Sequence, residues 1–96
     1  GGKSREELGR DGGEIMVSRA VSDHFEGLGD IVRLYGREPD PNHPHGYMIL
    51  AVFRASGNRM DYYGLDMSEA YSVGEAIEEV ECGFRRLSER GGRLAD

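Results

Sequence analysis

The chain has 96 residues, enough for one domain with a small core, because folding at this length removes only about 60 to 70% of the unfolded chain's accessible surface. Lysines and arginines number 12 against 18 aspartates and glutamates, and the resulting net charge of −6 opposes non-specific binding to nucleic acid or anionic lipid. No apolar run approaches the roughly 20 residues of a membrane span, and the single cysteine cannot form an internal disulfide. We therefore expect a cytoplasmic protein that binds neither nucleic acid nor membrane and needs no cofactor.

The two ends of the chain differ in composition from its middle. Residues 1–13, GGKSREELGRDGG, contain one large aliphatic side chain, Leu8, among many glycines and charges. Such a segment cannot bury enough apolar surface to offset the entropy lost on ordering. We predict a disordered tail over 1–13, a single domain over 14–90 and a C-terminal tail over 91–96.

A helical pattern opens the domain. Apolar residues recur at spacings of three and four between residues 17 and 35, as in a helix with one buried stripe. Gly27 and Gly29 oppose a continuous helix, since each costs about 1 kcal/mol relative to alanine. We expect a helix near 14–27, and then either more helix or a short strand over 30–36. His24 lies on the apolar stripe, where a packed histidine is the simplest interpretation.

The stretch PDPNHPHGY, residues 39–47, holds all 3 prolines and predicts a proline-rich loop, because proline is unsuited to a helix interior or a central strand. His43 and His45 flank Pro44 and can turn to one side, with Asp40 as a carboxylate ligand for zinc, nickel or copper. A protein zinc site needs three or four ligands, and no second His or Cys cluster is present. A solvated connector is therefore favoured, and a metal-binding protein or small enzyme remains the alternative.

The next segment, residues 47–67, reads as an antiparallel β-hairpin that turns at Gly57 and Asn58, a dipeptide suited to tight two-residue turns. Pairing about that turn matches aromatic or branched residues and one pair of opposite charges. The predicted pairs are Ser56 with Arg59, Ala55 with Met60, Arg54 with Asp61, Phe53 with Tyr62, Val52 with Tyr63, and Leu50 with Leu65.

Both faces of this hairpin are apolar. One carries Ile49, Ala51, Phe53, Ala55, Met60 and Tyr62, and the other carries Met48, Leu50, Val52, Tyr63, Leu65 and Met67. Two helices on opposite faces, a third strand from residues 31–35, or a second copy of the chain would each help to cover them. The small core favours a homodimer. The predicted interface comprises Tyr47, Met48, Leu50, Val52, Tyr62 and Tyr63.

The last element is a C-terminal amphipathic helix. Ser72 and Glu75 form a capping box at its start, and Gly91 and Gly92 predict its end. Cys82 lies opposite the apolar stripe, where an exposed surface cysteine is expected. The helix also carries an acidic row, which is either a solvated face or an inhibitory surface that imitates nucleic acid: Glu75, Glu78, Glu79 and Glu81.

The sequence thus predicts a two-layer α+β fold of helix, proline-rich loop, hairpin with a possible third strand, and helix. No catalytic motif is present, so we expect a small acidic protein-protein interaction module that self-associates through its hairpin region and meets another protein.

Overall fold

The computed structural model describes the backbone of residues 5–94 and the side chains of residues 15–90. Its elements follow in the order α1 (Arg5–Gly27), β1 (Ile31–Arg37), β2 (Tyr47–Ser56), β3 (Arg59–Asp66) and α2 (Val73–Leu94). Two helices and one antiparallel sheet confirm the α+β class.

The three strands form one sheet in the order β1-β2-β3. Residues 31–37 are a strand that pairs with β2, from Ile31 opposite Phe53 to Arg37 opposite Tyr47. The β2–β3 register agrees with all six predicted pairs. Gly57 has a φ of 62°, as the tight turn that sets this register requires. The first helix ends at Gly27 as expected, and Gly29, with a φ of 94°, lets the chain turn into β1.

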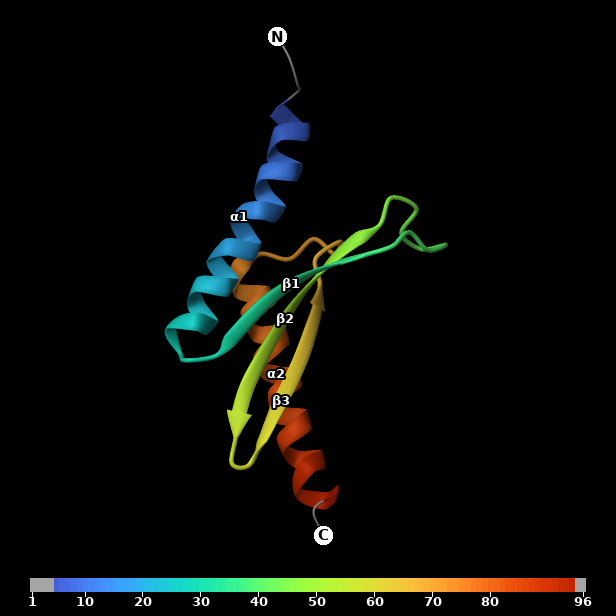
Figure 1. Cartoon of the computed structure of the whole chain (residues 1–96). Helices are drawn as coiled ribbons and strands as arrows, with labels where there is room; N and C mark the ends of the chain where they lie inside the picture. Colours follow the sequence, from blue (N-terminus) through green and yellow to red (C-terminus); the bar gives the residue numbers. More distant parts are fainter. Residues whose placement is uncertain (1–4, 95–96) are drawn as a thin grey trace.

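Both helices pack on the same face of the sheet (Figure 1). Side chains alternate between the two faces of a strand, and on the face of β2 toward the helices Leu50 and Val52 are fully buried. Helix α1 adds Val21 and Phe25 to this layer. The rest of the buried cluster consists of Val32, Leu65, Met67, Ala76, Val80 and Phe84. The helices therefore do not cover opposite faces of the hairpin, and within residues 5–94 no helix lies over the other face of the sheet.

The helix boundaries differ from the predicted tails. Helix α1 begins at Arg5, inside the segment 1–13, while residues 1–4 lie outside the described residues. Helix α2 begins with the predicted capping box: the Ser72 amide donates to Glu75 Oε1 at 2.9 Å, and the Glu75 amide donates to Ser72 Oγ at 3.1 Å. It continues through Gly91 and Gly92 to Leu94, because two glycines weaken a helix without forbidding it.

A partly buried arginine of β2, Arg54, connects the sheet to α2 and to the residue that follows the α1 turn. Arg54 on β2 donates from Nε and Nη2 to Asp30, with the shortest contact at 2.7 Å, and from Nη1 to Glu81 Oε1 on α2 at 2.6 Å. Hydrogen bonds to these two carboxylates, first Asp30 and then Glu81, raise the pKa of Arg54. Arg54 and Asp61 are cross-strand partners as predicted, but their charges pair elsewhere: Arg54 bonds Asp30 and Glu81, and Asp61 bonds Arg59 at 3.1 Å.

Candidate interaction surface

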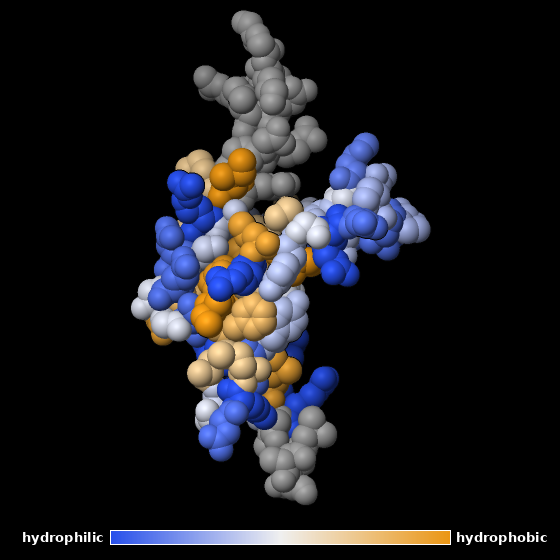
Figure 2. Space-filling view, viewed as in Figure 1, coloured by the Kyte–Doolittle hydropathy of each residue, from blue (hydrophilic) through white to orange (hydrophobic). Residues whose placement is uncertain are grey.

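The helix-free side of the sheet, called the open face below, is apolar at its centre. Four of its large side chains remain about half exposed: Ile31 at 43%, Tyr35 at 46%, Tyr62 at 50% and Met60 at 53%. In Figure 2 the hydrophobic colours gather over the middle of the sheet, with hydrophilic side chains around them. By the alternation of the paired strands, the open face comprises Ile31, Arg33, Tyr35, Arg37, Tyr47, Ile49, Ala51, Phe53, Ala55, Met60, Tyr62, Gly64 and Asp66.

At the centre of the open face, the Tyr62 side chain covers Gly64. A Cβ built on Gly64 would lie 2.6 Å from the Tyr62 hydroxyl and 3.1 Å from Ile49 Cγ2, so Tyr62 lies across the glycine. The Tyr62 ring also packs against Phe53, with 5.2 Å between the ring centroids. A ring that covers a glycine in an edge strand restores the apolar contact that the glycine lacks.

The charge of the open face differs from that of the whole chain. Arg33 and Arg37 project from β1, and the single carboxylate at the positions of this face, Asp66, is bound to His43. The open face, with two arginines and one aspartate, is therefore apolar and basic, although the chain as a whole carries −6.

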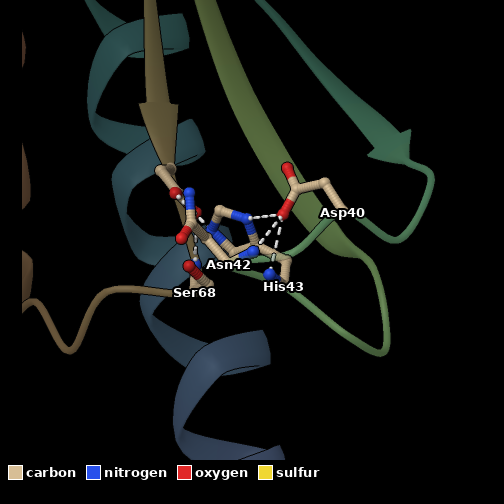
Figure 3. Close-up of polar contacts among 5 residues, drawn as sticks. Asp40, Asn42, His43 and Ser68 are labelled. Carbon is tan, nitrogen blue, oxygen red and sulfur yellow. Dashed lines mark hydrogen bonds and ion pairs between the residues drawn. The ribbon is translucent and has the colours of Figure 1, made fainter.

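The predicted metal-binding loop forms a hydrogen-bonded cluster around His43 (Figure 3). His43 Nδ1 lies 2.9 Å from Asp40 Oδ1, and Nε2 lies 3.1 Å from Asp66 Oδ2, while the amides of Asn42 and His43 donate to Asp40 Oδ1. The hydrogen bond to Asp40 is the main cause that raises the pKa of His43 above its ordinary value of 6.5, and it lowers the pKa of Asp40. Because both ring nitrogens contact carboxylates, the cluster fixes the loop to the end of β3.

The three predicted metal ligands do not share a site. Asp40 and His43 meet, but His45 is exposed and lies at the rim of a separate cleft. Among the side chains that the structure describes, no group of three or more His, Cys, Asp and Glu residues is placed to hold a metal ion. His43 also stacks on Tyr47, with ring centroids 3.9 Å apart, so its contacts hold the loop against the sheet.

His24 and Cys82 both differ in exposure from what the sequence predicts. His24 is exposed and sets its ring edge-on to Phe25, so it is not the packed histidine that the stripe suggested. Cys82 is partly buried rather than exposed, and Arg85 Nη2 lies 3.0 Å from its sulfur.

The predicted interface residues divide between the two faces. Tyr47 and Tyr62 lie on the open face, whereas Leu50 and Val52 are fully buried under the helices and are not available to a partner. Met48 and Tyr63 also point to the helix side. Tyr63 packs flat against Gly83 of α2, and burial raises the pKa of its hydroxyl.

Strand β1 supplies interface candidates that the sequence did not reveal. In the sequence, Ile31 and Tyr35 fit a helical stripe, because apolar spacings of three and four continue through them. The alternation of Ile31, Arg33, Tyr35 and Arg37 with Val32 and Leu34 was the available signal for a strand with two different faces.

The acidic row of α2 is largely engaged within the chain. Glu75 caps the helix, and the bond from the Ser72 amide lowers its pKa. Glu81 bonds Arg54, Glu79 is half-buried near Tyr63, and Glu78 is exposed. The four carboxylates do not form a free, regularly spaced array.

A cleft of about 590 Å³ lies on the helix side, between α1 and the ends of the strands next to the β1–β2 loop. Its apolar wall consists of Ile15, Leu34, Met48 and Met67, and polar groups line its rim. Leu34 and Met48 keep 50% and 43% of their surface exposed there.

In comparisons with known proteins, no family model, no curated protein and no solved structure matches this chain. Neither helix of the described chain combines the length and the apolar character needed to cross a membrane.

Proposed function

We propose that this protein is a non-enzymatic protein-protein interaction module that forms a homodimer through the open face of its sheet. One observation carries the proposal: both helices pack on the same side of the sheet, and a layer of half-exposed Ile31, Tyr35, Met60 and Tyr62 is left on the other. Sheets commonly bury such a face against a second layer. A second copy offers the same apolar layer and gives a closed, symmetric contact.

The size of the open face sets the expected strength of the dimer. Three strands about 4.8 Å apart and about eight residues long, at about 3.3 Å per residue, cover roughly 14 by 26 Å, or about 370 Å² per copy. Tight complexes bury about 800 Å² per partner. The proposed dimer is therefore weak, with a dissociation constant in the micromolar range, and another protein with a suitable surface can compete for the same face.

Charge adds a second expectation. Two chains that each carry −6 repel one another at long range, while the centre of the contact is apolar. Added salt screens that repulsion, so the dimer should be as strong or stronger at higher ionic strength. An interface held mainly by ion pairs would weaken under the same change.

Sedimentation equilibrium across a concentration series, from about 1 to 500 μM, tests the proposal against the micromolar range expected from area. The disruptive variant is Ile31→Glu, on the open face of β1, and its matched control is Leu34→Glu, on the helix side of the same strand. The two side chains have the same composition and similar exposure, 43% and 50%. We expect Ile31→Glu to shift the equilibrium to monomer and Leu34→Glu to leave it unchanged. A monomeric parent chain at the highest concentration, or equal effects of the two variants, would contradict the proposal.

A further inference from the structure

A shallow recess of about 240 Å³ indents the open face near the β1–β2 loop. Tyr35 and Arg37 of β1, Tyr47 and Ile49 of β2, and Tyr62 of β3 line it. The strand register brings them together, since Arg37 lies opposite Tyr47 and Tyr35 lies opposite Ile49. Three tyrosines, one arginine and one isoleucine thus line the recess.

Among side chains 15–90, the structure pairs no carboxylate with the guanidinium of Arg37. Arg54 and Arg59 each bond a carboxylate, but no ion pair within the described side chains involves Arg37. Asp66, the carboxylate on the same face, is already held by His43 at 3.1 Å. The recess therefore presents positive charge beside aromatic rings on a molecule with a net charge of −6.

Two of the tyrosine rings that line the recess are held by contacts within the chain. Tyr47 stacks on His43 with 3.9 Å between ring centroids, and His43 is held between two carboxylates. Tyr62 is held across Gly64 and against Phe53. Side chains that are already ordered lose less entropy on binding, which favours this recess as an anchor point.

We propose that the recess binds a glutamate side chain from a segment of a partner protein, with the carboxylate on the Arg37 guanidinium and the neighbouring apolar residues of that segment on the tyrosine rings. Small-molecule sites usually enclose about 300 to 1,000 Å³, so this recess suits one protein side chain better than a cofactor. A guanidinium matches a carboxylate with two parallel hydrogen bonds, and phenol hydroxyls add further donors. Pockets that accept one anchoring side chain are the usual energetic centres of protein interfaces.

This inference rests on the proposed function, because it assumes that the open face meets a protein. The probe is the peptide Ac-Ala-Phe-Glu-Phe-Ala-NH2, titrated into ¹⁵N-labelled protein and followed through amide chemical shifts. The titration is run on the parent chain and on Ile31→Glu, which lies at the far end of β1 and prevents self-association from masking the recess. We expect saturable shifts at Arg37, Ile49 and Tyr62.

Two comparisons give the test its specificity. The peptide with glutamine in place of glutamate should bind at least about tenfold more weakly, as expected for loss of a hydrogen bond to a charged group. Arg37→Gln should weaken binding of the glutamate peptide by a similar factor, while the control Arg33→Gln, on the same face and strand, should change it less than about twofold. The peptide comparison uses unaltered protein and holds even if a variant fails to fold.

Several results would overturn the inference: equal binding of the two peptides, no saturation below about 10 mM, or equal effects of Arg33→Gln and Arg37→Gln. Tighter binding of a glutamine peptide with a free C-terminal carboxylate would assign the recess to chain ends and also overturn it. A monomeric chain that binds the glutamate peptide would refute the dimer alone. A chain that dimerises but does not bind the glutamate peptide would refute only the proposal that the recess binds glutamate.

Discussion

Replacing Arg54 with methionine should destabilise the fold strongly, because one side chain connects three elements. The guanidinium bonds Asp30, which follows α1, and Glu81 of α2. It also lies over the Phe84 ring, 4.6 Å from the centroid, and 5.9 Å from the centroid of Phe25. Methionine keeps much of the apolar contact and removes the charge and every hydrogen bond.

The size of the stability loss in Arg54→Met follows from how deeply Asp30 and Glu81 are buried. The Asp30 side chain is only 6% exposed, so without Arg54 its carboxylate would remain buried with no cation. Removing one member of a buried ion pair costs about 3 to 5 kcal/mol. The Glu81 side chain is 31% exposed and can turn to water, so its bond adds at most about 1 kcal/mol. We expect a loss of about 3 to 6 kcal/mol, a large share of the roughly 5 to 15 kcal/mol that stabilises a typical domain.

Urea unfolding followed by circular dichroism measures this loss, with stability extrapolated linearly to water. The partner variant Asp30→Asn should cost less, since it leaves no buried charge, and the double variant should cost clearly less than the sum of the two single changes. A loss below about 1 kcal/mol for Arg54→Met, or strict additivity in the double variant, would refute the reasoning.

Three further predictions concern local contacts. Gly83→Ala would drive a methyl group into the Tyr63 ring and should destabilise the fold by about 1 to 3 kcal/mol. Gly74→Ala, whose new methyl meets no neighbouring group within 4 Å, should stabilise the fold by up to about 1 kcal/mol. Equal urea midpoints of the two variants would contradict this prediction. The pKa of His43 is raised in the folded chain, so its stabilising contribution is full below pH 6.5 and is lost as the pH rises through the folded pKa. The stability gap between the parent and His43→Gln should therefore shrink between pH 6 and pH 8, and a gap that widens would exclude the proposed cluster. Ser72→Ala should cost about 1 kcal/mol through the lost helix cap, and an unchanged thermal midpoint would count against that cap.

Features set by neighbouring residues were predictable from the sequence. The hairpin register depends on the turn at Gly57 and on pairs a few residues apart, and the start of α2 depends on Ser72 and Glu75, three positions apart. Each rests on local geometry and needs no knowledge of the rest of the fold. The division of the hairpin into two apolar faces was also predictable from alternation.

The side of the sheet that the helices cover was not predictable. Both faces of β2 carry large apolar residues, so hydrophobicity alone does not distinguish Leu50, in the core, from Ile49, on the open face. The partners of Arg54 lie 24 and 27 residues away, and only the packed fold brings them near. The same limit led to a metal hypothesis for His43, whose second carboxylate, on Asp66, lies 23 residues along the chain.

The contact between two copies can be observed directly by isotope-filtered NMR on an equal mixture of ¹³C-labelled and unlabelled chains. The proposed dimer predicts intermolecular nuclear Overhauser effects from the side chains of Ile31, Phe53 and Met60 on the open face. Their absence at concentrations where the chain sediments as a dimer, or their appearance at Leu34 and Met48 on the helix side instead, would contradict the assignment of the open face as the interface.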